Sequence, residues 1–155
     1  MDLALLRLAR ISDAPDLVNV YYGAFEREKI KVARQENDIT YMKNEIILED
    51  SCTVVATNPK NPKQIVAFAN YIRNQASLFV QGLFALENEY EAAKRLLGHT
   101  VLKAEFLGLP RIELDSSISA QGFYEHLGFV WQKDIETDGC RRYVLEVDKA
   151  DKLRL

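Results

Sequence analysis

AQGFYEHLGF, residues 120–129, indicates the fold more strongly than any other stretch of this 155-residue chain. Residues 120–127 predict a short helix that Gly128 stops. A strand at Arg111–Asp115 precedes this helix. Two strands follow it and close the chain, at Phe129–Lys133 and Arg141–Val147, with Thr137-Asp138-Gly139 as their turn. The chain is therefore predicted to end as strand, helix and antiparallel hairpin.

The longest helical pattern of the chain lies upstream. Apolar residues recur three and four apart from Tyr90 to Leu107, and Gly108 stands where a helix C-cap glycine belongs. A strand at Ser77–Leu86 precedes this helix, and the strand at Arg111–Asp115 follows it. A strand, a crossover helix and a strand in this order predict a parallel pair of strands.

The N-terminal half predicts a strand, two helices and an antiparallel meander. The strand covers Leu3–Ala9, and Ser12 and Asp13 can cap the first helix. A second helix starts near Asp38 with Ile39, Met42 and Ile46 on one face, and a highly charged connection at residues 26–37 precedes it. Three strands joined by short turns then follow, at Cys52–Ala56, Gln64–Arg73 and Ser77–Leu86.

These elements predict one domain over residues 1–155 of the α/β (α+β) class. We expect a mixed, mostly antiparallel sheet of about six or seven strands with helices on both faces and a central β-α-β crossover.

Composition narrows the choice of partner and compartment. A net charge of -3 gives no general attraction for nucleic acid or an anionic membrane. Two cysteines are too few for a disulfide scaffold, and no cluster of histidines and cysteines suggests a metal. The start of the chain has no signal-peptide pattern, and no run reaches the ~18 apolar residues of a membrane span. We expect a cytoplasmic protein without nucleic-acid, membrane or metal partners.

Residues 120–129 resemble the late motif of the GCN5-related N-acetyltransferase (GNAT) family, in which an alanine precedes Phe-Tyr and then Gly-Phe. Ser117 takes the polar position three residues before the alanine. The strand IELD at residues 112–115 resembles the fifth strand of the family. The opening LRLA at residues 6–9, followed by a helix with Asp16, resembles its beginning. The order of elements agrees over nearly the whole chain.

The chain departs from the family where the pyrophosphate of coenzyme A should bind. The family uses a loop of pattern Arg/Gln-x-x-Gly-x-Gly/Ala there, because glycines let the backbone approach phosphates and helix-start amides then donate to them. This chain has LENEYEAAKR at residues 86–95. Counting back from Gly108 places Asn88, Glu91 and Ala93 at the three pattern positions, of which Ala93 alone fits.

A second register of this loop also exists. RLLGHT at residues 95–100 nearly matches the pattern, with Gly98 as its first glycine. It leaves only Val101–Leu107 as helix, which is short for a parallel crossover. The first register therefore agrees better with the helical pattern.

The resemblance implies acetyl-CoA as co-substrate and assigns site residues. Tyr124 matches the tyrosine that often protonates the leaving thiolate, and a phenol pKa near 10 suits that task. Glu26, Gln81 and Glu87 are candidate general bases by position, and Glu87 is favoured because it stands at the end of the fourth strand. The backbone of the fourth strand would hold the pantetheine arm. The residues implied in coenzyme binding are Phe84, Ala85, Leu86, Ala92, Ala93, Lys94, Arg95, Ser117 and Ala120.

We expect an acetyl-CoA-dependent N-acetyltransferase that transfers acetyl directly to a small-molecule or peptide amine. Two alternatives stay open, because Glu91 takes the place of the first glycine of the loop pattern at the start of the long helix. One is a non-catalytic GNAT-fold binding or regulatory protein that has lost coenzyme A binding. The other is an acyltransferase that uses another acyl donor. The C-terminal strands also offer a surface for a homodimer.

Overall fold

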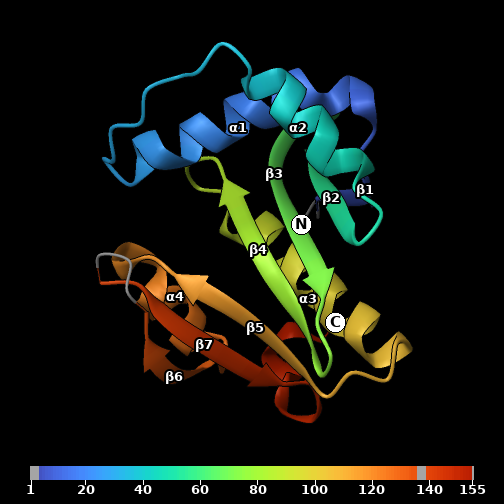
Figure 1. Ribbon diagram of the computed structural model, residues 1–155, viewed down its shortest axis with the longest axis vertical. Coiled ribbons are helices and arrows are strands. Elements are labelled where there is room, and N and C mark those ends of the chain that lie inside the picture. The colour runs from blue at the N-terminus through green and yellow to red at the C-terminus, as the bar shows by residue number, and fades with distance from the viewer. Residues whose placement is uncertain (1–3, 136–138, 155) are drawn as a thin grey trace. The chain divides into compact units, whose positions relative to one another are not determined.

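The computed structural model describes residues 4–135 and 139–154 of the chain. The described strands form one seven-stranded mixed sheet in the order β1-β2-β3-β4-β5-β7-β6 (Figure 1). The strands are β1 (Leu5–Leu8), β2 (Ser51–Asn58), β3 (Asn61–Arg73), β4 (Ser77–Ala85), β5 (Arg111–Ser116), β6 (Val130–Asp134) and β7 (Arg141–Glu146). The helices are α1 (Ala14–Arg27), α2 (Asp38–Ile47), α3 (Tyr90–Phe106) and α4 (Gln121–His126).

The strand pairing confirms the predicted fold class. β4 and β5 pair in parallel, with Ser77–Val80 against Arg111–Leu114. β1 pairs with β2, β5 with β7, and β6 with β7, all antiparallel. The sheet is therefore mixed and mostly antiparallel, with α3 as the crossover between the parallel strands.

The crossover helix α3 runs without a break from Tyr90 to Phe106. Its end follows the prediction: Gly108 has a left-handed φ of +71°, and the amide of Leu109 donates to the carbonyl of Ala104 at 2.8 Å. This back-bond is typical of a Schellman C-cap. Because Gly98 lies inside this helix, the second register of the phosphate loop, at residues 95–100, is wrong.

The described chain divides into two compact units, one of residues 1–70 with 82–96 and one of residues 71–81 with 97–155. The prediction of a single domain stays a prediction. We call them the first and the second unit and describe each by itself. The hydrophobic core cluster of the first unit consists of Leu17, Val20, Val55, Ile65 and Phe68.

Helix α2 meets this core with only part of its predicted apolar face. Met42 and Ile46 pack against the core cluster, as the helical spacing predicts. Ile39 lies on the same helical face by its spacing, but it is 42% exposed. Ile39 lies in the first turn of α2, and contact with the core begins one turn later.

The second unit has its own core, formed on one face of its strands. In β5, Ile112 and Leu114 are buried while Arg111 and Glu113 are only partly buried, which is the two-residue alternation of a strand with one covered face. Tyr143 and Leu145 of β7 are buried as well. The short helix α4 precedes Gly128, whose φ of +100° ends it as predicted. Of the predicted final turn, Thr137 and Asp138 lie outside the described residues, as does Leu3 of the first predicted strand.

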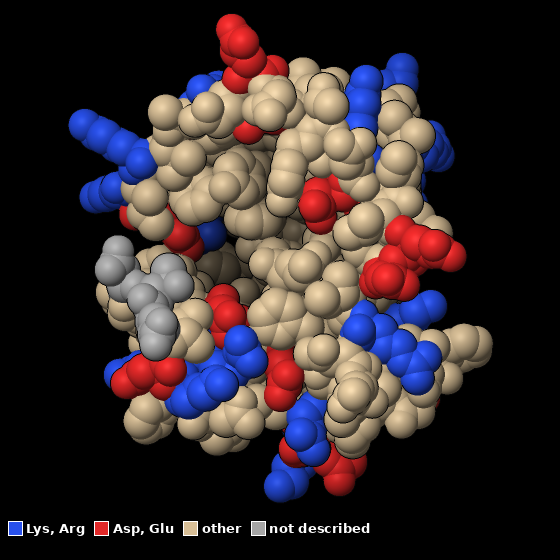
Figure 2. Space-filling model, in the orientation of Figure 1, with Lys and Arg blue, Asp and Glu red and all other residues tan. Residues whose placement is uncertain are grey.

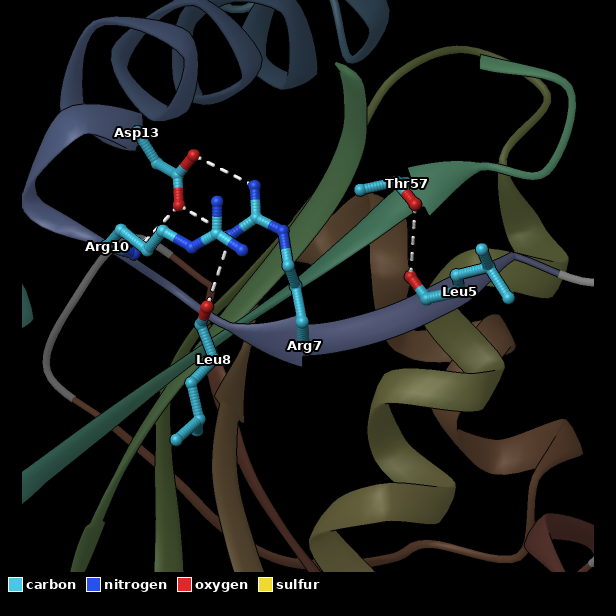
Figure 3. A network of polar contacts seen from close by, with 6 residues as sticks. All are labelled: Leu5, Arg7, Leu8, Arg10, Asp13 and Thr57. Carbon is cyan, nitrogen blue, oxygen red and sulfur yellow. Dashed lines mark hydrogen bonds and ion pairs between the residues drawn. The ribbon is translucent and has the colours of Figure 1, made fainter. Parts of the chain in front are cut away.

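The start of α1 is held by an ion pair rather than by a side-chain cap. A short 3-10 turn, η1 (Ile11–Asp13), precedes the helix. Both guanidinium ends of Arg7 donate to the Asp13 carboxylate, at 2.7 and 2.9 Å, and the amide of Arg10 donates to it at 2.7 Å (Figure 3). Asp13 is the N-cap residue, but its carboxylate ties α1 to β1 instead of bonding the helix amides.

Candidate functional site

The junction between β4 and α3 is a tight turn. The amide of Glu89 donates to the carbonyl of Leu86 at 3.2 Å, and Asn88 has a left-handed φ of +66°. Asparagine adopts this conformation more readily than most residues, so it can close the turn without glycine. The helical ladder of α3 then starts, with the amide of Ala93 bonded to the carbonyl of Glu89 at 3.1 Å.

The last peptide group of β4 is fixed at both ends. The amide of Leu86 donates to the carbonyl of Val66 on β3 at 2.9 Å. The carbonyl of Ala85 accepts a hydrogen bond from Nε of Arg27 at 3.2 Å. Leu86 therefore uses its amide toward β3 and its carbonyl toward Glu89. Because backbone groups alternate along a strand, those of Ala85 point to the opposite edge of β4, which suits a strand-like ligand better.

Phe84 is held by aromatic neighbours. Its ring centroid lies 4.9 Å from that of Tyr21, 6.2 Å from that of Phe25 and 5.1 Å from that of Phe68. Tyr21 and Phe25 also stack edge to face at 4.8 Å. These tilted arrangements are favourable for aromatic pairs. The side chain of Phe84 is therefore a packing anchor of β4.

The first turn of α3 combines small residues with acidic ones. Ala92 and Ala93 are buried. Glu87 and Glu91 are exposed, whereas Glu89 is partly buried and its burial raises the pKa of its carboxyl. Glutamates at a helix N-terminus favour the helix but oppose a phosphate. The charge of this first turn therefore opposes a bound diphosphate.

Two basic residues follow one turn later. Lys94 and Arg95 are both partly buried. Nε of Arg95 is buried without a hydrogen-bond partner among the described residues. An unpaired buried donor is unfavourable, and an anion that accepted a hydrogen bond from it would remove this penalty.

The remaining predicted site residues belong to the second unit. Tyr124 of α4 is 7% exposed, with its ring centroid 5.3 Å from that of Phe123 and 5.5 Å from that of Phe129. Ser117 precedes the 3-10 turn η2 (Ile118–Ala120), and its carbonyl accepts the amide of Ala120 at 3.2 Å. Ser117, Ala120 and Tyr124 therefore lie in one unit, and residues 84–95 lie in the other.

Arg27 is a further residue of this region, and no sequence pattern pointed to it. It is the last residue of α1, whereas the charge pattern assigned residues 26–37 to a connection. The apolar spacing of α1 ends at Phe25, so no periodic signal extended the helix to Arg27.

The surface carries both signs of charge. On the face shown in Figure 2, acidic and basic side chains are interspersed. Within residues 4–135 and 139–154, no three His, Cys, Asp or Glu side chains gather into a group that could hold a metal ion. None of the described helices has the length and apolar character needed to cross a bilayer.

Comparisons of sequence identify no relative of this chain. No protein-family model matches the sequence. No curated protein matches it either.

Comparisons of structure do find similar proteins. A GNAT-family acetyltransferase from Staphylococcus aureus Mu50 superimposes with a TM-score of 0.75 and 20% identity, over 93% of this chain and 99% of that one. The PaiA N-acetyltransferase of Thermoplasma acidophilum, solved in complex with coenzyme A, superimposes with a TM-score of 0.74 and 15% identity, over 92% and 98%. An aminoglycoside 6'-acetyltransferase of type Ii gives 0.70 and 11%, over 92% and 97%.

At these identities the similarity establishes architecture rather than activity. The superpositions cover nearly all of each compared chain. The protein therefore has the fold of the GNAT acetyltransferases.

Proposed function

We propose that this protein is an acetyl-CoA-dependent N-acetyltransferase that transfers acetyl directly to an amine. The junction of residues 85–93 carries the proposal: a strand end, a turn closed by a left-handed Asn88, and a long helix beginning at Tyr90. A protein with this fold, the PaiA N-acetyltransferase, has been solved in complex with coenzyme A.

The start of α3 supplies donors for a diphosphate. The first helical hydrogen bond is donated by Ala93, so the amides of Glu91 and Ala92 precede the helical ladder. Such amides, together with the positive end of the helix dipole, favour an anion. The unpaired Nε of Arg95 adds a cationic donor one turn further along. Lys94 adds a second positive charge on the same turn.

The chemistry needs one group to accept a proton and another to donate one. Glu87, exposed on the turn after β4, accepts the proton of the attacking amine as its nitrogen bonds to the acetyl carbon. Tyr124 donates its phenolic proton to the sulfur as the carbon–sulfur bond breaks. A phenol suits this role because its pKa lies within about two units of that of a thiol. Ser117 and Ala120 precede Tyr124 and would contact the coenzyme through their turn.

A second candidate function follows from the acidic first turn of α3. Glu87, Glu89 and Glu91 lie just before or at the start of α3, where phosphates would bind, and no glycine stands between Gly82 and Gly98. This pattern favours a GNAT-fold protein that binds a ligand or partner without coenzyme A, or one that takes acyl groups from another donor.

Calorimetric titration with acetyl-CoA and with coenzyme A distinguishes these functions. Micromolar binding of acetyl-CoA supports the transferase, whereas no binding at millimolar ligand by the folded protein refutes it. With an accepted amine in hand, Tyr124→Phe should lower kcat by about a hundredfold while changing KM little, as expected for loss of a general acid. An unchanged kcat would exclude Tyr124 as the proton donor.

A further inference from the structure

We propose that Arg27 is a positioning residue of the acetyl-transfer site, which orients the peptide group at the end of β4. The inference rests on the proposed function, because that peptide group lies in the segment that would hold the pantetheine arm. Arg27 donates its Nε–H to the carbonyl of Ala85, although the two residues are 58 positions apart in the sequence.

The peptide group that joins Ala85 to Leu86 is tied in two directions. Its carbonyl accepts from Arg27 at 3.2 Å, and its amide donates to the carbonyl of Val66 at 2.9 Å. In a planar trans peptide these two groups point to opposite sides. Any rotation of the plane would therefore disturb both hydrogen bonds.

Other residues of α1 also pack against this end of β4. Gly23 lies one turn before Arg27, and a Cβ atom at Gly23 would stand 2.6 Å from Cδ2 of Leu86. Tyr21 of α1 contacts the ring of Phe84. Helix α1 thus contacts three successive residues: Phe84 by its ring, Ala85 by a charged hydrogen bond, and Leu86 by close packing.

The hydrogen bond from Arg27 to the Ala85 carbonyl orients the peptide group rather than neutralising a charge. The carboxylate beside Arg27 is that of Glu28, whose Oε1 lies 3.7 Å from an Nη atom, beyond hydrogen-bond distance. Ala85 is 8% exposed, so the Arg27 bond forms at the edge of the interior. By fixing the plane before the turn, Arg27 sets the direction of the Ala85 backbone groups and the point where the chain leaves for α3.

Two variants of Arg27 separate a hydrogen bond from a charge. Glutamine carries its amide nitrogen the same number of bonds from Cα as Nε of arginine, whereas methionine fills a similar volume without a donor. Both remove one positive charge and both are good helix formers. Arg34→Met is the matched control, because Arg34 contacts Asn19 and the ring of Tyr22.

Two measurements test the proposal. Native-state hydrogen exchange of the Leu86 amide should accelerate about tenfold in Arg27→Met and return to within about threefold of wild type in Arg27→Gln, with the Ala9 amide as an internal reference. The calorimetric Kd for acetyl-CoA should rise about tenfold in Arg27→Met, which corresponds to about 1.4 kcal/mol, and recover in Arg27→Gln. Arg34→Met should change neither quantity.

The outcomes separate this inference from the proposed function. Wild-type binding of acetyl-CoA with an unchanged Kd in Arg27→Met overturns the positioning role alone. Equal losses in Arg27→Met and Arg27→Gln overturn the hydrogen-bond argument in favour of charge. If wild type does not bind acetyl-CoA, both the proposed function and the role of Arg27 in it are overturned. The hydrogen exchange of the Leu86 amide then decides whether Arg27 holds the peptide group at the end of β4.

Discussion

Replacing Gly98 by alanine should destabilise the protein, although alanine is the better helix former. Gly98 lies inside α3, where alanine alone would gain about 1 kcal/mol. A Cβ atom there would lie 2.8 Å from the backbone carbonyl oxygen of Leu153. Overpacking of this kind costs typically about 1–3 kcal/mol, because a backbone atom cannot rotate away as a side chain can. With a cost of about 2 kcal/mol, the net loss of stability is about 1 kcal/mol.

The neighbouring structure shows why this clash is hard to relieve. Leu153 ends the 3-10 turn η4 (Asp151–Leu153) and is 3% exposed. The next residue, Arg154, donates to the carbonyl of Val147 at 2.8 Å and forms an ion pair with Glu105 of α3. Moving the carbonyl would therefore disturb a buried leucine and two polar contacts.

Gly122→Ala is the matched control for this prediction. Gly122 lies in α4, and nothing stands within 4 Å of a Cβ atom built there. Alanine at this position should stabilise the protein by up to about 1 kcal/mol. Urea unfolding followed by circular dichroism gives both changes, provided that the m-values agree. If Gly98→Ala stabilised the protein as much as Gly122→Ala does, the packing of α3 against the C-terminal turn would be refuted.

The same variant tests whether the phosphates bind at the start of α3. In the structure, Gly98 contacts the carbonyl of Leu153 and lies two turns beyond the start of α3. Gly98→Ala should therefore leave the Kd for acetyl-CoA within about twofold, well under the tenfold that 1.4 kcal/mol represents. A large loss of affinity in a folded Gly98→Ala variant would instead place the phosphates near residues 95–100.

Two further predictions concern charge. The Arg7 guanidinium and the Arg10 amide hold the pKa of Asp13 below its usual value, so Asp13 stabilises the fold above about pH 4 and loses this contribution as the pH falls toward its lowered pKa. Asp13→Asn should lower the free energy of unfolding in urea by about 2 kcal/mol at pH 7 and should reduce the loss of stability between pH 4 and lower pH. An unchanged dependence of stability on pH would contradict the ion pair. A carboxylate ~6 Å from a phosphate charge opposes binding by roughly 0.7 kcal/mol in water and roughly 3 kcal/mol at an effective dielectric of ~20. Because Glu91 is exposed, Glu91→Gln should tighten acetyl-CoA binding about three- to tenfold, with a smaller gain at ~0.5 M salt. Weaker binding would show that Glu91 does not face the phosphates.

Local sequence patterns predicted most of the fold. The apolar spacing from Tyr90 and the glycine at position 108 predicted a helix ending at Leu107, and α3 ends at Phe106. Short turns between β-branched segments predicted the strands, because such turns bring neighbours in sequence together as neighbours in space. Each of these signals is contained within about twenty residues of the chain.

Contacts between distant residues left no such signal. The bond from Arg27 to Ala85 joins two elements 58 residues apart, and neither residue type predicts it. Gly98 is a second residue whose distant contact the sequence did not predict. Its sequence context, RLLGHT, suggested a phosphate loop, but its small size serves the approach of the Leu153 carbonyl. A glycine inside a helix indicates that another group approaches closely, but the sequence does not identify that group.

Asn88 lets the chain turn from β4 into α3 without the glycines of the family pattern. With a φ of +66°, Asn88 closes the turn from β4, and the amides of α3 then begin where the strand ends. We therefore expect this departure from the pattern to act on phosphate binding through its charge. Carboxylates weaken phosphate binding in a salt-dependent way, whereas a misplaced helix start would abolish it. Salt dependence of the acetyl-CoA Kd thus separates the two explanations: if Glu89 and Glu91 are the obstacle, screening should partly offset the loss of phosphate attraction, and affinity should vary less with salt than for a site lined by cations alone.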